Sequence, residues 1–227
     1  MTRRSPVRPL PAAALFDWDG TIVDTMPLIY RVNVIVLREL GITLSKEWFR
    51  ERYTPDWRAS YRDLGVPEDR WDAVAARWAE EMQAGRPRAI PWARGALRRL
   101  ARRGVRLGLV TASTRGVVEP NLRRLNLDGV FETACFSDDV VNGKPHPEAL
   151  LRALADLGVD PADSVYVGDT TVDLEMASSA GAPFEAVAGT TSEATFRAAG
   201  VARVWPGVGQ WVDDLLGTGA GQSRGRG

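Results

Sequence analysis

Short apolar runs along the chain alternate with segments whose apolar residues recur at a helical spacing. The apolar runs have the length and composition of buried strands, and they span residues 12–16, 106–110, 165–167 and 185–188. The helical patterns span residues 116–125, 147–157 and 172–180, and Gly158 and Gly181 follow the last two as stop signals. This alternation predicts an α/β fold with a doubly wound, Rossmann-like parallel sheet and helices on both faces.

The segment between Thr25 and Arg94 shows no strand pattern and carries two helical stripes, one over residues 27–40 and one from Trp71 to Met82. Five tryptophans lie in this region, at positions 48, 57, 71, 78 and 92. We expect residues 26–92 to form a small α-helical cap domain with its own core, in which about one of the five tryptophans contacts a substrate. Residues 1–25 and 93–227 then form the catalytic core. The stretch 217–227 is rich in Gly, Ser and Arg, which predicts a flexible tail.

Charge and composition narrow the possible partners and compartments. The chain of 227 residues has 29 basic and 29 acidic side chains, so no overall field favours nucleic acid or a charged membrane. The apolar runs are shorter than a membrane span, and residues 1–11 lack the apolar stretch of a signal peptide. Cys135 is the only cysteine, which excludes an internal disulfide. We therefore expect a cytoplasmic protein, monomeric or homodimeric, that binds neither nucleic acid nor membrane.

His146 is the only histidine, and the chain has no Gly-x-Ser-x-Gly motif for a Ser-His-Asp triad. Proton transfer in an enzyme of this sequence therefore falls to carboxylates.

Two carboxylates follow the first predicted strand in the motif Asp17-Trp18-Asp19-Gly20-Thr21. If the strand geometry persists, the side chains of Asp17 and Asp19 point the same way, and Gly20 lets the chain turn sharply behind them. Two close carboxylates repel each other unless a cation lies between them, and Mg²⁺ suits a site of few carboxylates, water and phosphate. The alternative for such a motif alone is a polar turn that caps a helix.

Two further motifs offer groups that suit a phosphate. Thr111, Ala112 and Ser113 follow the strand at 106–110, where hydroxyl and backbone N–H groups can hold phosphate oxygens or cap a helix. Lys144 lies between Gly143 and Pro145, and it is one of only two lysines. A compact ammonium suits a phosphate or an aspartyl phosphate, although a surface lysine is the alternative for this motif alone.

The fourth motif is Gly168-Asp169-Thr170-Thr171-Val172-Asp173, directly after the strand at 165–167. Asp169 and Asp173 are four residues apart, which would place them on one face of the first turn of a helix. Acids at a helix N-terminus also serve as caps, so capping is the alternative here.

The four motifs, in this order and at four predicted strand ends, resemble the haloacid dehalogenase superfamily over residues 12–216. The resemblance implies a phosphatase with a phosphorylated aspartate, with Asp17 as nucleophile and Asp19 as general acid and base. It implies that Thr111 binds the transferring phosphoryl group and that Lys144 neutralises the charges of nucleophile and phosphate.

The same resemblance implies a magnesium site. Asp169 would bind Mg²⁺ together with Asp17 and the backbone carbonyl of Asp19, and Asp173 would support the metal. The segment 26–92 lies where the family has its small helical cap, which selects the substrate. Weaker candidates for contacts with phosphate or substrate are Gly20, Thr21, Ala112, Ser113 and Arg58.

Within the family, Asp19 argues against the dehalogenases and phosphonate-cleaving enzymes, which lack this second acid. Sugar-phosphate mutases of the β-phosphoglucomutase type keep Asp19, but they tend to carry Glu-Asp at the fourth motif. Gly168-Asp169 followed by Asp173 resembles the phosphoglycolate-phosphatase-like branch. The prediction is therefore a magnesium-dependent phosphatase acting on a small-molecule phosphate monoester, with the mutase as the alternative.

Two interpretations that place the chain in another functional class stay open. A response-regulator receiver domain shares the phosphorylated aspartate, the acid pair, a hydroxyl and a lysine, but it has no room for the helical insertion. A catalytically silent binding module would not need all four motifs. In the predicted cap, the loop from Tyr53 to Arg58 is the candidate for substrate contact, and Arg58 could bind a carboxylate or a second phosphate of the substrate.

Overall fold

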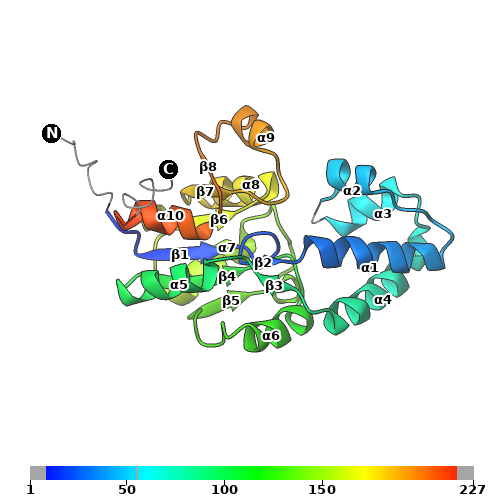
Figure 1. The fold of residues 1–227 in the computed structure, drawn as a ribbon, viewed down its shortest axis with the longest axis horizontal. Coiled ribbons are helices and arrows are strands. Elements are labelled where there is room, and N and C mark those ends of the chain that lie inside the picture. The colour runs from blue at the N-terminus through cyan, green and yellow to red at the C-terminus, as the bar shows by residue number, and fades with distance from the viewer. Residues whose placement is uncertain (1–8, 55, 219–227) are drawn as a thin grey trace, which may run out of the picture.

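The alternating strands and helices form a parallel sheet in the computed structural model, which describes residues 9–54 and 56–218. Within this part of the chain, six parallel strands lie in the order β5-β4-β1-β6-β7-β8. They are β1 (Ala13–Phe16), β4 (Arg106–Val110), β5 (Thr133–Cys135), β6 (Ser164–Gly168), β7 (Phe184–Val187) and β8 (Val204–Trp205). The predicted α/β fold class is confirmed (Figure 1).

All four predicted strands are present, and each of their ends lies within one residue of the expected bound. The sequence pattern did not predict β5 and β8, because two or three residues are too few to show an apolar run. These two strands form the edges of the sheet.

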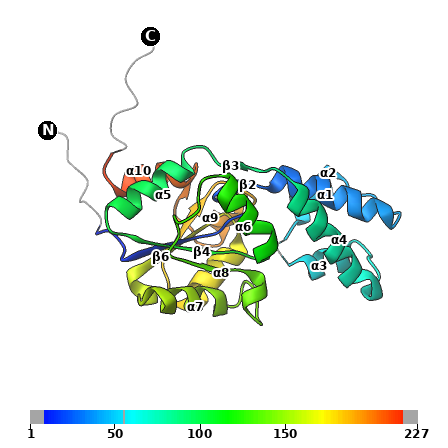
Figure 2. The ribbon, with the colours of Figure 1, turned by 90° about the horizontal axis from the view of Figure 1, so that it is seen from below.

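Helices cover both faces of the sheet (Figure 2). One face is covered by α5 (Ala93–Arg102), α6 (Arg115–Arg124) and α10 (Val208–Leu215), and the other by α7 (Glu148–Leu157) and α8 (Thr171–Ala180). The last connection, between β7 and β8, contains the short helix α9 (Glu193–Ala198). The predicted helical segments are confirmed, and Gly158 and Gly181 end α7 and α8 in the left-handed conformation.

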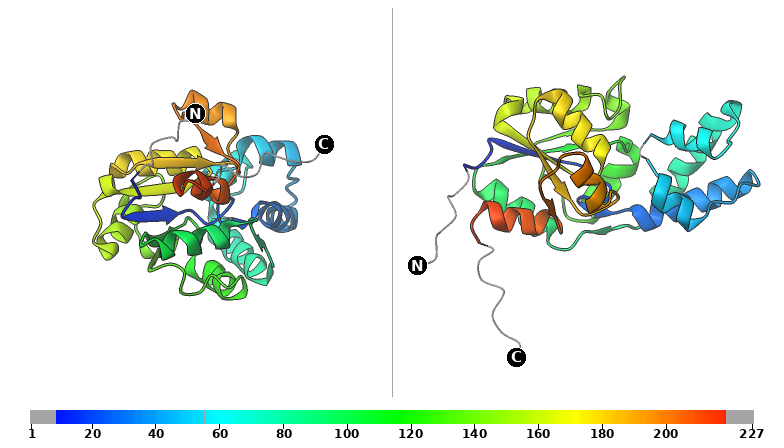
Figure 3. Two further views of the ribbon diagram at one scale, coloured as in Figure 1. Left: turned by 60° about the vertical axis from the view of Figure 1, so that its left-hand side comes forward. Right: turned by 90° about the horizontal axis from the view of Figure 1, so that it is seen from above.

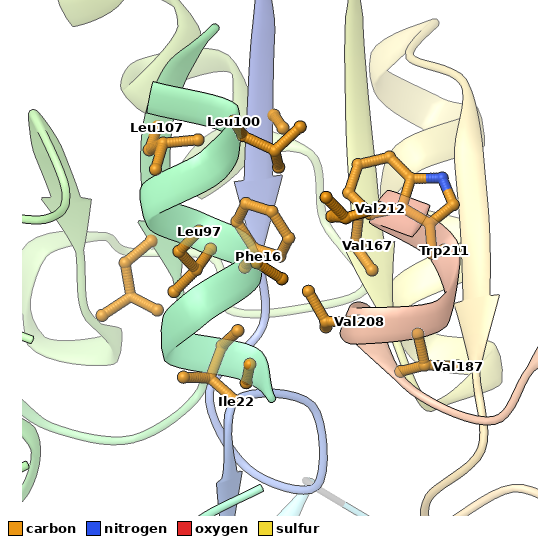
Figure 4. Packing of buried hydrophobic residues seen from close by; sticks show 14 of the residues in the cluster. Phe16, Ile22, Leu97, Leu100, Leu107, Val167, Val187, Val208, Trp211 and Val212 are labelled. Carbon is orange, nitrogen blue, oxygen red and sulfur yellow. The ribbon is translucent and has the colours of Figure 1, made fainter. Parts of the chain in front are cut away.

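The core between β1 and the helices α5 and α10 fixes the strand that carries the first acidic motif (Figure 4). Phe16 is fully buried there and meets Trp211 edge to face, with ring centroids 6.0 Å apart. Leu97 and Leu100 of α5 complete this contact region. Truncation of a phenylalanine in such a place costs about 3–5 kcal/mol, so the packing holds Asp17 rigidly at the strand end.

A group of helices lies beside the sheet as an insertion with its own core (Figures 1 and 3). It consists of α1 (Met26–Glu39), α2 (Lys46–Arg52), α3 (Trp57–Asp63) and α4 (Trp71–Ala84). Side-chain caps start two of them: Ser45 accepts a hydrogen bond from the N–H of Trp48, and Asp56 accepts from the N–H groups of Arg58 and Ala59. The limits 26–92 of the cap domain stay a prediction.

The expectation that residues 25–94 contain no strand was wrong in one detail. β2 (Val23–Asp24) and β3 (Arg88–Ala89) pair antiparallel where the chain leaves and re-enters the sheet domain. Two-residue strands have no alternating pattern to detect, and this pairing depends on the closure of the insertion.

The predicted tail from residue 217 lies outside the described residues from position 219 onward. Thr218 itself is held, because its N–H donates to the carbonyl of Asp213 and its hydroxyl accepts from Arg99. No helix in the described ranges is both long enough and apolar enough to cross a membrane.

Candidate active site

The first acidic motif leaves β1 with its side chains still alternating. Trp18 points into the core and is 1% exposed, while Asp17 and Asp19 on either side line a cavity between the sheet and the inserted helices. The N–H of Asp17 donates to the carbonyl of Val167 at 2.9 Å, which ties the motif to β6. The sequence-based expectation that both carboxylates point the same way is therefore met in the structure.

Lys144 reaches this site and is almost fully buried, with 3% of its side chain exposed. Its Nζ donates to Oδ1 of Asp17 at 2.6 Å, to Oδ1 of Asp173 at 2.8 Å and to the hydroxyl of Tyr166 at 2.6 Å. The surface-lysine alternative is excluded by this burial. The three acceptors use all three N–H bonds of the ammonium, so its position is determined.

Asp169, directly after β6, lies in a close-fitting cradle and is fully buried. Its Oδ1 accepts from the hydroxyl of Thr21 at 3.2 Å, and its Oδ2 accepts from the N–H of Thr190 at 2.6 Å. A Cβ atom added at Gly20 or at Gly189 would lie 2.3 Å from Oδ2 of Asp169. Gly20 also has a φ of +80°, which favours glycine. Only glycine, which has no Cβ, leaves room for the Asp169 carboxylate at these two positions.

The placement of Asp169 and Asp173 together on the first helical turn was wrong. Thr170 is the N-cap of α8, so Asp169 lies between the end of β6 and the helix, and only Asp173 lies in the helix. Asp173 does form a capping box, in which its Oδ2 accepts from the N–H and the hydroxyl of Thr170. Its Oδ1 faces Lys144, so one side chain serves both as a cap and as a partner in the buried cluster.

The second motif lies beside Asp19 at the end of β4. The hydroxyl of Ser113 donates to Oδ2 of Asp19 at 2.7 Å, and the N–H of Ser113 donates to Oγ1 of Thr111 at 3.0 Å. Ala112 and Ser113 both line the cavity. Oδ1 of Asp19 is buried and has no hydrogen-bond partner among the described residues. The side chain of Thr25, whose hydroxyl is also buried, lowers the pKa of this carboxyl group.

The site buries four carboxylates with one cation, and this imbalance shifts the pKa values of its groups. The carboxylates are Asp17, Asp19, Asp169 and Asp173, and the cation is Lys144. Burial raises the pKa of Asp17 well above its usual range, and Lys144 opposes this shift. Burial also raises the pKa of Asp19, and the side chains of Thr25 and Ser113 oppose this shift. For Lys144, burial works against the ammonium, but the carboxylates of Asp17 and Asp173 outweigh it and raise its pKa. The excess of negative charge favours a bound cation.

The donor set fits a hard divalent cation. Asp17, Asp169 and Asp173 each offer a carboxylate oxygen, and these oxygens all lie within 4.8 Å of one another. Oxygen donors of this kind suit Mg²⁺. Asp169 is held by neutral donors, the hydroxyl of Thr21 and the N–H of Thr190, whereas Lys144 lies against both Asp17 and Asp173.

The cavity measures about 320 Å³, and residues of all four inserted helices contribute to its lining. Three of the five tryptophans line it, namely Trp48, Trp57 and Trp78. How many of them contact a substrate stays a prediction. Trp71 donates its indole N–H to the carbonyl of Val66, and Trp92 is 77% exposed.

Only part of the loop from Tyr53 to Arg58, which was predicted to contact the substrate, lies at the cavity. Tyr53 and Thr54 line the cavity, whereas Arg58 is exposed and its guanidinium lies 4.3 Å from the ring centroid of Trp57. Pro55 lies outside the described residues. Desolvation and the negative charges of Asp19, Asp169 and Asp17 raise the pKa of Tyr53, so this residue of the insertion lies within electrostatic range of the acidic cluster.

Sequence reasoning missed two residues of the site. Tyr166 lies in the middle of β6, where it was counted as part of an apolar run; its hydroxyl accepts from Lys144 and donates to the carbonyl of Val110 at 2.9 Å. The need of a buried tyrosine hydroxyl for a partner was the available signal. Thr190 contributes a backbone N–H to Asp169, which no side-chain pattern reveals, and its side chain also lowers the pKa of Asp169. His146, in contrast, is exposed, and Cys135 is buried as a small apolar side chain.

Comparison with known proteins agrees with this geometry. Residues 14–187 match the model of the haloacid dehalogenase-like hydrolase family, so the chain belongs to that family. A phosphoglycolate phosphatase from Yersinia pestis is 27% identical over 179 residues, covering 74% of this chain and 77% of the relative. Pyrophosphatase PpaX from Bacillus cereus is 30% identical over 181 residues, covering 78% and 82%. The predicted family and the predicted enzyme class, a phosphatase-type hydrolase, are thereby confirmed.

The fold is also that of solved members of the family. A crystal structure of a haloacid dehalogenase-like hydrolase from Bacteroides fragilis superposes with a TM-score of 0.82 at 27% identity. The match covers 88% of this chain and 99% of that one, so it includes the inserted helices as well as the sheet.

Proposed function

We propose that this protein is a magnesium-dependent phosphatase that hydrolyses a small phosphate monoester through a phosphorylated Asp17. The observation that carries the proposal is the contact between Lys144 and Asp17 at 2.6 Å, at the floor of a cavity that Asp19 also lines. A buried carboxylate with an ammonium beside it and a second acid two residues away meets the needs of in-line phosphoryl transfer.

In the first half-reaction, the Asp17 carboxylate attacks the phosphorus atom and the bond to the ester oxygen breaks. Asp19 donates its proton to the leaving oxygen, for which its raised pKa is favourable. In the second half-reaction, Asp19 takes a proton from a water molecule that attacks the acyl phosphate. Inorganic phosphate leaves and Asp17 is regenerated.

Other residues of the chain hold the phosphoryl group. We expect the hydroxyl of Thr111 and the backbone N–H of Ala112 to donate to its oxygens, and Lys144 to offset its negative charge. Asp17, Asp169 and the backbone carbonyl of Asp19 would hold Mg²⁺, with Asp173 in support, and the metal would supply further positive charge at the phosphoryl group.

The test is hydrolysis of p-nitrophenyl phosphate by the full chain. We expect turnover that disappears with EDTA, returns with Mg²⁺ and does not return with Ca²⁺, whose larger and looser shell disturbs in-line geometry. Asp17→Asn keeps the side-chain size and should abolish turnover with the fold intact by circular dichroism. Turnover of a metal-stripped sample, or of Asp17→Asn at a wild-type rate, would contradict the proposal.

A further inference from the structure

The part of the cavity contributed by the insertion is lined by aromatic rings. They are Trp48, Phe49 and Tyr53 around α2, Trp57 and Tyr61 on α3, and Trp78 on α4. Aliphatic side chains, including Ile29, Leu44 and Leu64, fill the surface between the rings. The insertion also contributes the uncharged polar side chains of Asn33, Thr54 and Ser60. The acidic floor at Asp17 and Asp19 thus faces an uncharged, predominantly apolar upper half.

No cation of the insertion faces this space among the described residues. Lys144 is the only positively charged residue in the lining, and it is already bound by Asp17 and Asp173. The arginines of α3 lie elsewhere: the guanidinium of Arg58 stacks on Trp57 and that of Arg62 lies 5.5 Å from the ring centroid of Trp71.

This lining discriminates between classes of leaving group. A carboxylate or a second phosphate in the upper half would lose its hydration without gaining a cation, which costs several kcal/mol. An apolar group gains about 25 cal/mol for each Å² removed from water, and ring faces add favourable stacking. A volume of about 320 Å³ lies at the lower end of the range for ligand pockets, so the leaving group is small.

Resting on the phosphatase function proposed above, we propose that the substrate is the phosphate monoester of a small, uncharged alcohol with an aromatic or aliphatic body. The phosphate lies at Asp17 and Lys144, and the apolar body packs against Trp48, Trp57 and Trp78. Substrates with a second anionic group, such as phosphoglycolate or pyrophosphate, are disfavoured, although relatives of this chain bear those names.

A quaternary ammonium is the other chemistry that ring faces attract. The aliphatic side chains in the lining argue against it, because a cation in contact with Ile29, Leu44 and Leu64 loses hydration without compensation. The experiment therefore includes a cationic substrate as a separate arm.

The test compares three phosphates of primary alcohols, whose reacting bonds are similar: 2-phenylethyl phosphate, phosphoglycolate and phosphocholine. With the full chain and Mg²⁺, we expect kcat/KM for 2-phenylethyl phosphate to be higher than for either of the others by about tenfold or more. Equal or higher values for phosphoglycolate or phosphocholine would overturn the proposal.

Two tryptophans of α4 provide a matched pair of variants. Trp78 lines the cavity and Trp71 does not. Trp78→Leu should raise KM for 2-phenylethyl phosphate about fivefold or more, and should raise KM for acetyl phosphate, whose acyl group is a single methyl, by a smaller factor. Trp71→Leu should leave both unchanged. Equal KM for the two variants contradicts the proposal, and Trp48→Leu replaces Trp78→Leu if the latter fails to fold.

A binding measurement separates this inference from the proposed function. If wild-type protein hydrolyses acetyl phosphate in an Asp17-dependent way but shows no preference among the three esters, the phosphatase function stands and the substrate class is wrong. If no ester is hydrolysed, the function is wrong. Binding to Asp17→Asn, followed by tryptophan fluorescence, then decides the substrate class, since 2-phenylethyl phosphate should bind at least about tenfold more tightly than phosphoglycolate.

Discussion

The Nζ atom of Lys144 lies 2.6 Å from Oδ1 of Asp17, and neither side chain is more than 8% exposed. Asp173 holds the ammonium from the other side at 2.8 Å. One buried cation therefore fixes the orientation of the proposed nucleophile and connects the end of β1 to the first turn of α8.

Lys144→Arg preserves the charge but should lower kcat about 100-fold or more, because a planar guanidinium does not fit between three acceptors at 2.6–2.8 Å. The measurement is steady-state turnover of p-nitrophenyl phosphate. Lys46→Arg, at the exposed start of α2, is the control and should have no effect. Wild-type rates for Lys144→Arg would mean that the third motif has no catalytic role.

Ser113→Ala should shift the pH profile of kcat/KM. The hydroxyl of Ser113 donates to Asp19 and stabilises its ionised form, so removing it raises the pKa of Asp19 further. If Asp19 must be protonated to act as the acid, the alkaline limb of the profile moves to higher pH. Ser179→Ala, on the exposed face of α8, is the matched control. An unchanged alkaline limb in Ser113→Ala would argue that Asp19 is not the acid.

Stability of the metal-free protein should depend on Asp169. Burial raises its pKa from 3.8 to about 6, so the folded state holds this proton more tightly than the unfolded state. The free energy of unfolding therefore falls as the pH rises from 3.8 through 6, by at most about 3 kcal/mol from this group. Mg²⁺ requires the ionised carboxylate, so it should raise Tm more at pH 7 than at pH 5.

Calorimetry of wild type and Asp169→Asn, each with EDTA or Mg²⁺, tests this. The variant should lose part of the decrease in metal-free Tm between pH 5 and pH 7, and most of the increase caused by Mg²⁺. Glu175→Gln, an exposed acid of α8, should behave as wild type. Identical pH dependence in wild type and Asp169→Asn would contradict the raised pKa.

Gly189→Ala should weaken Mg²⁺ binding roughly 10- to 100-fold, because its Cβ would lie 2.3 Å from Oδ2 of Asp169 and displace the carboxylate. Titration of activity with Mg²⁺ gives the apparent affinity. Gly95→Ala is the control: nothing lies within 4 Å of its Cβ, and alanine in helix α5 should stabilise the protein by about 0.5–1 kcal/mol. Unchanged Mg²⁺ affinity in Gly189→Ala would show that the cradle tolerates a larger residue.

Much of the fold can be predicted from the local pattern of apolar residues. The strands that this pattern did not predict share one feature, their short length. β1, β4, β6 and β7 were predicted because buried strands need apolar runs, and α7 and α8 because glycine stops follow them. β5, β8 and the β2–β3 pair are too short to show periodicity, and they exist because neighbouring strands supply their hydrogen bonds.

The sequence by itself determined the family of this protein and the candidate residues of its site. Asp17, Asp19, Thr111, Lys144 and Asp169 follow strands or turns that apolar patterning specifies, and parallel strands bring their carboxyl ends to one edge. Only the tertiary structure decided which groups meet. Lys144 contacts Asp17, 127 residues earlier, and Tyr166; Thr21 and the N–H of Thr190 fix Asp169; and the rings of the insertion, rather than Arg58, face the site. The physical reason is that these contacts depend on packing between distant segments, which no local period encodes.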